Sequence, residues 1–153
     1  AIPADKIISQ KVNIWIAESM LSTKADLETN FSDMIKLGEI FGVELKKREE
    51  VIPYAKKLQE KGAKNVLVSM AGEGAVLIDE NGREYMSPVP KGKVVNAVGA
   101  GDSMVAGFMA GYMEKEDYLH AFHMGIAAGS ASAFSENLAT REEIASVYEQ
   151  ITK

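Results

Sequence analysis

The chain has 153 residues, of which 46% are hydrophobic and 25% are charged, a mixture typical of a globular domain rather than of a disordered or fibrous chain. It carries 17 Lys and Arg against 22 Asp and Glu, a net charge of −5, which argues against partners such as nucleic acid or an anionic membrane. There is no Cys, so disulfides, thiolate metal sites and thiol nucleophiles are excluded, and we expect a cytoplasmic protein.

The first third of the chain carries only weak patterns. Alternating β-favouring residues predict a short strand over residues 12–16. Apolar residues at helical spacing predict a helix over residues 33–41 that ends at Gly42, because glycine is favoured just after helix C-termini.

The middle of the chain predicts one helix followed by one buried strand. Apolar residues on one face indicate an amphipathic helix over residues 48–61, and Pro53 fits if the helix starts late enough to place it in the first turn. Gly62 ends this helix. Residues 65–70 form an apolar run typical of a strand that is buried on both faces in a parallel sheet.

A glycine turn and a hairpin follow. Residues 71–74 form a tight turn, and residues 75–79 predict a second strand. The Asn-Gly pair within residues 80–82 is typical of a hairpin turn. The returning strand at residues 83–89 is expected at an edge of the sheet, because prolines at its end cannot donate to a neighbouring strand.

The last third predicts three helices. The first begins near residue 103 and contains Gly107 and Gly111, which implies that another element packs close to its backbone. Residues 118–135 lack charge over 18 positions, yet their Ser, His and Gly content favours a buried helix over a membrane span. A capping box opens the last helix at Thr140. This order of elements indicates an α/β fold with ligand sites at the carboxyl ends of the strands.

The strongest chemical signal is the segment Gly99, Ala100, Gly101 and Asp102 at the start of a predicted helix. Glycine backbone and the helix N-terminus can together direct N–H groups at a phosphate. A carboxylate in that turn would repel the phosphate, but it could accept a proton from a hydroxyl that attacks it. On spacing alone, a plain helix cap at Asp102 remains the commoner explanation.

Two further motifs are weaker. The turn from Ser69 to Gly74 follows a strand and could approach a phosphate or ribose, although a simple β-turn is favoured. His120 and His123 have a spacing that could serve a metal, but packed or surface histidines are favoured because no Cys or carboxylate pair accompanies them.

The segment from Val94 to Phe108 resembles the signature of ribokinase-like (PfkB-type) carbohydrate kinases. Residues 69–74 resemble that family's nucleotide-binding turn, and residues 37–42 resemble the start of the helix before it. The form of the motif around Asn96 is most similar to the branch that contains 1-phosphofructokinases and tagatose-6-phosphate kinases. The resemblance runs over residues 37–153, whereas residues 1–36 match poorly.

The resemblance implies a ribokinase-like Rossmann-type α/β fold, of which this chain holds the C-terminal, nucleotide-binding portion. It implies transfer of the γ-phosphoryl group of ATP, accompanied by Mg²⁺, to a hydroxyl of a sugar phosphate. Asp102 would be the catalytic base and Gly99, Ala100 and Gly101 the anion hole. The helix around residues 127–129 would pack near the adenine. The nucleotide site would be lined by Ser69, Ala71, Gly72, Glu73 and Gly74.

The chain also departs from the family. Members are about twice as long, and the missing half would carry the sugar-binding element and a lid through which a homodimer could form. An Asn-x-x-Glu pair that supports Mg²⁺ is expected just before residue 37, but Asp33 and Lys36 stand there. No metal ligands are therefore assigned. The alternatives are a nucleotide-binding regulatory module without turnover, and a kinase for a nucleoside or a vitamin alcohol.

Overall fold

The computed structural model describes residues 14–17 and 48–153 of the chain. The predicted helix at residues 33–41, the Asp33 and Lys36 positions and the expected boundary at residue 36 lie outside these ranges. The predicted strand at residues 12–16 corresponds to β1 (Ile14–Ala17) in its described part.

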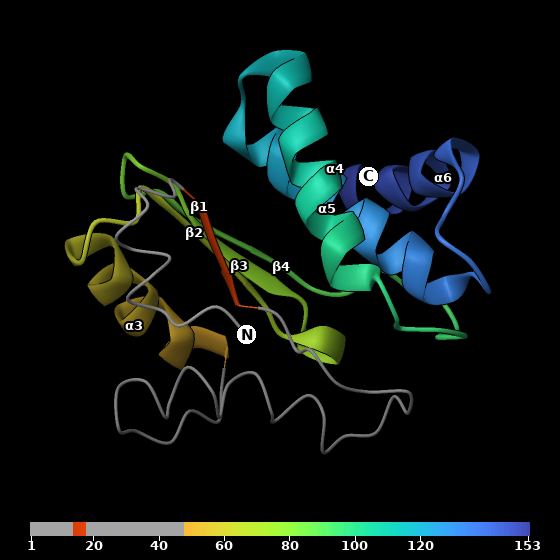
Figure 1. The fold of residues 1–153 in the computed structure, drawn as a ribbon, viewed down its shortest axis with the longest axis horizontal. Helices are drawn as coiled ribbons and strands as arrows, with labels where there is room; N and C mark the ends of the chain where they lie inside the picture. The colour runs from red at the N-terminus through yellow and green to blue at the C-terminus, as the bar shows by residue number, and fades with distance from the viewer. Residues whose placement is uncertain (1–13, 18–47) are drawn as a thin grey trace.

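The described elements follow the predicted order of helix, strand, turn, hairpin, loop and three helices (Figure 1). After β1 come α3 (Arg48–Glu60), β2 (Asn65–Ser69), the 3₁₀ turn η1 (Ala71–Glu73), β3 (Ala75–Ile78), β4 (Glu84–Ser87), α4 (Ala100–Lys115), α5 (Tyr118–Phe134) and α6 (Arg141–Thr152).

The four strands form one sheet in the order β1-β2-β3-β4. The prediction of a parallel sheet around β2 is correct on one side only: β2 runs parallel to β1 and antiparallel to β3. The reason lies in the connection, since the short turn η1 reverses the chain, whereas a parallel pair needs a long crossover. The hairpin between β3 and β4 is confirmed, with Gly82 N donating to Asp79 O at 2.9 Å.

The sheet is covered on both faces, as Figure 1 shows, with α3 on one side and α4 to α6 on the other. This explains why β2 reads as a continuous apolar run, because alternate side chains of a strand enter opposite cores. On the α3 side, Val66 and Val68 pack against Val51, Ala55 and Leu58. On the other side, residues of β2 and β3 pack against α4 and α5: Leu67, Ala75, Leu77, Met104, Phe108, Ala121, Phe122 and Ile126.

Pro53 lies inside α3, so the prediction that this helix starts late enough to hold Pro53 in its first turn is wrong. Proline removes one helical hydrogen bond and is unfavourable in a helix interior by about 3 kcal/mol. The helix is retained because Val51 and Ala55 are fully buried against the sheet, and tertiary packing outweighs local preference.

The predicted helix over residues 118–135 is α5, and it is buried along most of its length. Asp117 begins it, with its carboxylate accepting from the N–H of His120 at 2.6 Å. Within the described ranges, no helix is both long and apolar enough to cross a membrane. The capping box is also confirmed, since Thr140 N donates to Glu143 and Glu143 N donates to Thr140 Oγ1.

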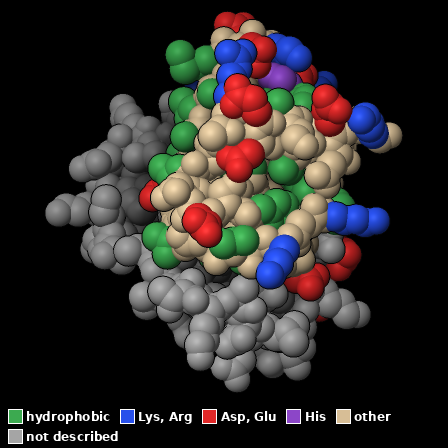
Figure 2. Space-filling model, turned by 90° about the vertical axis from the view of Figure 1, so that its right-hand side faces the viewer, with side chains coloured by type: hydrophobic (Ala, Val, Ile, Leu, Met, Phe, Trp, Pro, Cys, Tyr) green, Lys and Arg blue, Asp and Glu red, His purple; other side chains and the backbone are tan. Residues whose placement is uncertain are grey.

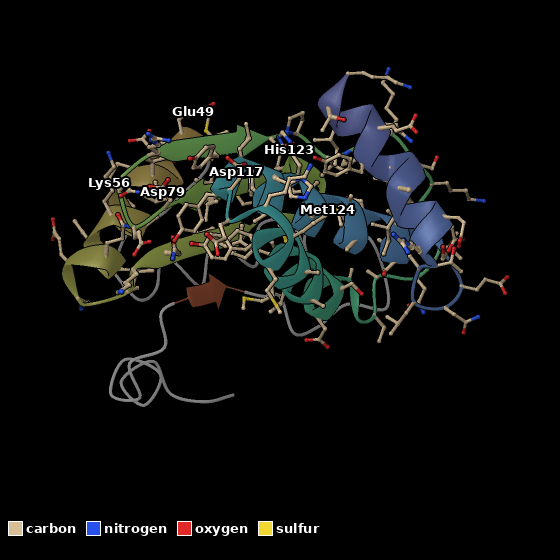
Figure 3. All side chains as sticks on the ribbon, turned by 90° about the horizontal axis from the view of Figure 1, so that it is seen from above. Glu49, Lys56, Asp79, Asp117, His123 and Met124 are labelled. Carbon is tan, nitrogen blue, oxygen red and sulfur yellow. The ribbon has the colours of Figure 1, made fainter. Side chains whose placement is uncertain are left out.

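The helices α4 and α5 approach each other through glycines, as the sequence predicts. A Cβ placed on Gly107 would lie 2.6 Å from the Ala128 Cβ and 2.6 Å from the carbonyl oxygen of Met124. Met124 faces α4 from α5, and Figure 3 shows it next to that helix. The close approach sets the position of α4, and with it the position of everything at its N-terminus.

Gly107→Val is therefore expected to lower the free energy of unfolding of the chain by about 2–3 kcal/mol, because the backbone of α5 must move away. Chemical denaturation followed by circular dichroism measures this. Ala106→Val is the matched control: it introduces the same side chain at the next position of α4, where Ala106 is exposed, and should cost less than about 0.7 kcal/mol. Equal losses in the two variants would contradict the packing.

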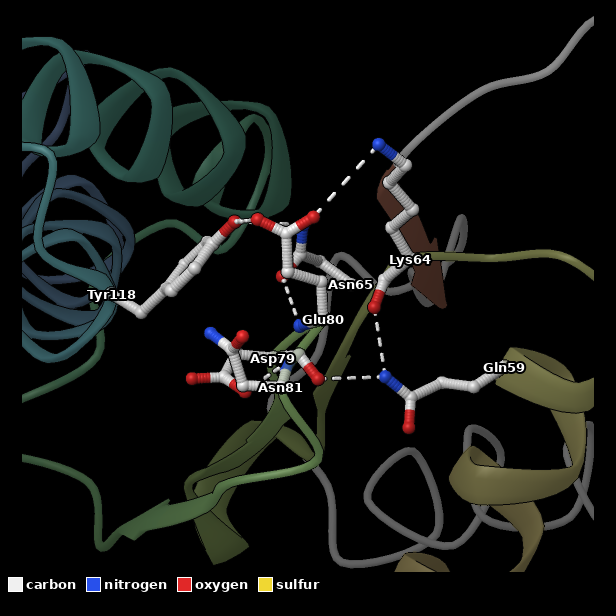
Figure 4. Close-up of polar contacts among 7 residues, drawn as sticks. All are labelled: Gln59, Lys64, Asn65, Asp79, Glu80, Asn81 and Tyr118. Carbon is white, nitrogen blue, oxygen red and sulfur yellow. Dashed lines mark hydrogen bonds and ion pairs between the residues drawn. The ribbon is translucent and has the colours of Figure 1, made fainter.

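Polar side chains join the elements at the end of β2 opposite η1 (Figure 4). Gln59 of α3 donates to the carbonyl oxygens of Lys64 and Asp79, both at 2.8 Å. The Tyr118 hydroxyl donates to Glu80 at 2.8 Å, and burial raises the pKa of this phenol, so it stays protonated. This network holds α3 and α5 against the sheet. The predicted site lies at the other end of the strands.

Candidate functional site

The predicted phosphate loop lies where β4 leads into α4. Gly99 is the residue at which α4 begins, and its φ of +79° places it in the left-handed region, where glycine is favoured. Gly99 has no side chain with which to cap the helix, so the N-terminus of α4 presents backbone groups. The loop thus has the geometry that the sequence predicts: a glycine turn opening directly into a long helix.

The N–H groups of the first helical turn have no acceptor within the helix itself. The N–H of Ala100 donates to the carbonyl oxygen of Ala97 at 3.2 Å, so this donor is shared with the turn. The N–H groups of Gly101 and Asp102 lie in the first turn of α4, at the positive end of the helix dipole. This arrangement suits an anion at the end of α4.

Asp102 is exposed in the first turn of α4. Among the described residues, 14–17 and 48–153, none donates a hydrogen bond to its carboxylate or pairs with it. The residue that begins the helix is Gly99, and no side chain caps it. A plain capping role for Asp102 is the commoner explanation on spacing alone, but no contact in the described part of the structure supports it.

Asn96 holds the loop through two side-chain hydrogen bonds, a role that the sequence pattern does not indicate. Its side-chain oxygen accepts from the N–H of Val98 at 3.0 Å, and its amide donates to the carbonyl oxygen of Glu136 at 3.2 Å. The first contact closes a local turn that an Asn two residues ahead of its partner commonly makes. The second joins two segments 40 residues apart, for which the sequence carries no signal.

The loop also caps the end of α5. The N–H groups of Val95 and Asn96 both donate to the carbonyl oxygen of Ala133, at 2.8 and 3.1 Å. Carbonyl groups in the last turn of a helix need such outside donors. The predicted phosphate loop is therefore joined directly to the C-terminal end of α5.

The second predicted segment is the turn between β2 and β3. Ser69 ends β2 and is partly exposed, and Ala71, Gly72 and Glu73 form η1 and are exposed. Gly74 closes the turn at a φ of +94°, with its carbonyl oxygen accepting from Met70 N at 2.8 Å. The favoured interpretation as a turn is confirmed: residues 71–73 are exposed, whereas Gly74 is buried against Ser87 and Pro88.

The turn η1 directly follows the carboxyl end of β2, and in Figure 1 it and the N-terminus of α4 both lie toward the lower side of the coloured elements. Large apolar side chains are exposed in the segments next to the start of α4. Val98 is 62% exposed in the loop, and Leu138, 66% exposed, approaches Gly99 from the segment between α5 and α6. The glycine loop at the start of α4 is therefore bordered by an apolar surface.

The helix around residues 127–129 does not offer such a surface. Ala127 packs in the core beneath α6, and Gly129 faces the carbonyl oxygen of Ala100, so both are buried. The structure thus places this stretch beneath α4 and α6, and its packing near an adenine stays a prediction.

In the view of Figure 2, acidic side chains are spread over the middle of the face, and Lys and Arg side chains stand toward its margins. The part of this face formed by described residues carries no continuous basic surface of the kind that a nucleic-acid backbone requires.

The two histidines are packing residues, as the sequence favours. His120 is buried between three helices, with Nε2 3.0 Å from Glu114 and Nδ1 2.7 Å from the Tyr148 hydroxyl. Burial lowers the pKa of the neighbouring His123, so this ring stays neutral around pH 7. No cluster of three or more potential metal ligands occurs among the described residues.

The fold and the site together define a class of protein: an α/β domain with a glycine loop that opens a long helix and a carboxylate in the first turn of that helix. Residues 27–145 match the model of the pfkB family of carbohydrate kinases, and the chain belongs to this family. The resemblance predicted from residues 94–108 is thereby confirmed.

Individual relatives agree with this assignment. The chain is 54% identical over 107 residues to a 1-phosphofructokinase of Bacillus subtilis, a match that covers 70% of this chain and 35% of the relative. A 1-phosphofructokinase of Borreliella burgdorferi is 31% identical over 119 residues, or 78% of this chain and 39% of the relative. The matched part thus spans little more than a third of these relatives.

Solved structures agree on the fold. Phosphofructokinase-2 from Escherichia coli, crystallised with potassium, superimposes with a TM-score of 0.70 at 27% identity over 78% of this chain and 39% of that chain. A ribokinase from Thermotoga maritima superimposes with a TM-score of 0.67 at 22% identity, covering 97% and 54% of the two chains. The predicted ribokinase-like α/β fold is confirmed.

Proposed function

We propose that this chain supplies the nucleotide-binding and phosphoryl-transfer part of an ATP-dependent sugar-phosphate kinase that acts on fructose 1-phosphate. The observation that carries the proposal is the exposed carboxylate of Asp102, without a partner among the described residues, in the first turn of a helix opened by a glycine loop. The acceptor class follows from the names of the relatives, which are 1-phosphofructokinases.

In this proposal, the backbone of Gly99, Ala100 and Gly101 binds the phosphoryl oxygens. Negative charge on the transferring group is spread over its oxygens, and preorganised N–H donors stabilise it. The N–H of Gly101 lies in the first turn of α4, where it can donate to a phosphoryl oxygen. The N–H of Ala100 first has to leave the carbonyl oxygen of Ala97, a bond that is already long at 3.2 Å.

Asp102 acts as the general base. The acceptor hydroxyl transfers its proton to the carboxylate while its oxygen forms a bond to the γ-phosphorus and the bond from phosphorus to the bridging oxygen of ADP breaks. The carboxylate suits this role because it is exposed and unengaged by described residues, and because the anion site at the helix end brings the phosphorus to the same turn.

The nucleotide is held between the two segments at the carboxyl end of β2. Ser69, Ala71, Gly72, Glu73 and Gly74 form its wall from the β2–β3 turn. The exposed apolar side chains of Val98 and Leu138 provide a surface for the base. Mg²⁺ enters with ATP as part of the substrate, since this ion is commonly held by phosphates and water with one or two carboxylates.

The chain alone is expected to bind ATP weakly and to phosphorylate no sugar, because positioning of the acceptor supplies much of the catalysis and the sugar-binding element is expected outside this segment. Isothermal titration of purified 1–153 with ATP and a steady-state kinase assay measure both. Rapid phosphorylation of fructose 1-phosphate would contradict this division of roles. Absence of ATP binding at millimolar concentration would contradict the proposed function itself.

A further inference from the structure

A single buried hydroxyl connects the start of α4 to the segment after α5. Ser132 of α5 is 3% exposed. Its Oγ donates to the Oγ of Ser103 at 2.9 Å and accepts from the N–H of Ala139 at 3.2 Å. The side chain therefore joins the start of α4, 29 residues away in the sequence, to the segment that follows α5.

The first of these contacts, with Ser103, acts on the first turn of α4, which contains the carboxylate of Asp102. Ser103 directly follows Asp102, and its N–H donates to the carbonyl oxygen of Gly99 at 2.9 Å. Three residues before Ser132, Gly129 presents bare backbone to α4: a Cβ there would lie 2.9 Å from the carbonyl oxygen of Ala100. The face of α5 that contains these two residues thus sets both the distance and the rotation of the first turn of α4.

The second contact, with Ala139, acts on the segment between α5 and α6 that borders the loop. Ala139 ends the segment that leads from α5 to α6, in which Leu138 lies against Gly99 and Glu136 accepts from the Asn96 amide. If the N–H of Ala139 lost its acceptor, this segment would be free to move away from the loop. A buried hydroxyl that both donates and accepts is costly to remove, because the groups that it bonds are left without partners.

We propose that Ser132 is a positioning residue for the phosphate site: through Ser103 it holds the first turn of α4, and through Ala139 it holds the segment that borders Gly99. This inference rests on the proposed function, since it gives Ser132 its role only if the loop binds nucleotide phosphate. Ser132 itself contacts no phosphate, and its effect passes through the two residues that it bonds.

The test compares Ser103→Ala, Ser132→Ala and the double variant of chain 1–153, with Ser146→Ala on the exposed face of α6 as the matched control. ADP is titrated into ¹⁵N-labelled protein, and the amide signals of residues 99–102 give the dissociation constant. Thermal melting of each variant reports its stability separately.

Ser103→Ala is expected to weaken ADP binding about three- to tenfold, the factor that corresponds to one net hydrogen bond. Its melting temperature should stay close to that of the unchanged chain, because alanine is the better helix former. Ser132→Ala should weaken binding at least as much and also lower the melting temperature. The double variant should bind no more weakly than Ser132→Ala, and Ser146→Ala should bind normally.

Unchanged ADP affinity in Ser103→Ala, or additive losses in the double variant, would overturn the inference and leave Ser132 an ordinary helix-packing residue. If Ser132→Ala does not fold, Ser103→Ala decides alone, since it removes the hydroxyl contact without stranding the N–H of Ala139. Failure of the proposed function would give a different result. The unchanged chain itself would show no ADP-dependent shifts at residues 99–102, and the inference about Ser132 would then be wrong as well.

Discussion

Replacing Asp102 with Asn in a full-length kinase that contains this segment is expected to lower kcat about 10²–10⁴-fold, the usual contribution of a positioned general base. The amide keeps the size of the side chain but cannot accept the proton of the acceptor hydroxyl. Stability should change by less than about 1 kcal/mol, since Asn suits a helix N-terminus about as well as Asp. Affinity for ATP should be equal or slightly higher, because a negative charge near the phosphates is removed.

The matched control is Asp117→Asn, the same change at the residue that caps α5 at the opposite end of α4. It should leave kcat unchanged. A decrease in kcat of less than about tenfold for Asp102→Asn, or about 1.4 kcal/mol of transition-state stabilisation, would mean that Asp102 is not the base. Unfolding of that variant at ordinary temperature would instead indicate that the side chain serves the fold.

Gly74→Ala is expected to have the largest effect on stability, a loss of about 3–5 kcal/mol in the free energy of unfolding. Gly74 has φ +94° and ψ −142°, a conformation almost confined to glycine, which costs about 1–3 kcal/mol for other residues. A Cβ there would also overlap the carbonyl oxygen of Ser87 and lie 3.0 Å from Pro88 Cα, so β4 must move. Overpacking of this kind adds about 1–3 kcal/mol.

Gly82→Ala separates these two causes. Gly82 has a φ of +76° in the β3–β4 hairpin of the same sheet, but a Cβ there would meet nothing within 4 Å. Its substitution should cost only the left-handed conformation, about 1–2 kcal/mol. Urea denaturation of both variants gives the comparison, and similar losses at the two glycines would show that the contact with Ser87 does not constrain the turn.

The site was predictable where its parts are local. A glycine turn before a helix can be recognised from Gly99 to Asp102 alone, because backbone freedom and helix polarity depend on neighbouring residues only. The contact of Asn96 with Glu136 and the link from Ser132 to Ser103 were not predictable, since each joins positions about 30 to 40 residues apart. Which helices cover residues 127–129 was not predictable for the same reason, since it is known only from the packing.

The sequence by itself determined the order of the elements, the hairpin at Asn81 and Gly82, the capping box at Thr140 and the glycine loop at Gly99, because each depends on conformational preferences within a few residues. Tertiary structure alone decided that β2 pairs in opposite senses with its two neighbours and that α3 keeps Pro53 in its interior. It also decided that Ser132 of α5 bonds both Ser103 of α4 and Ala139 of the segment that borders Gly99. These outcomes depend on which faces become buried together, and the free energy of that burial exceeds the local preferences that a sequence displays.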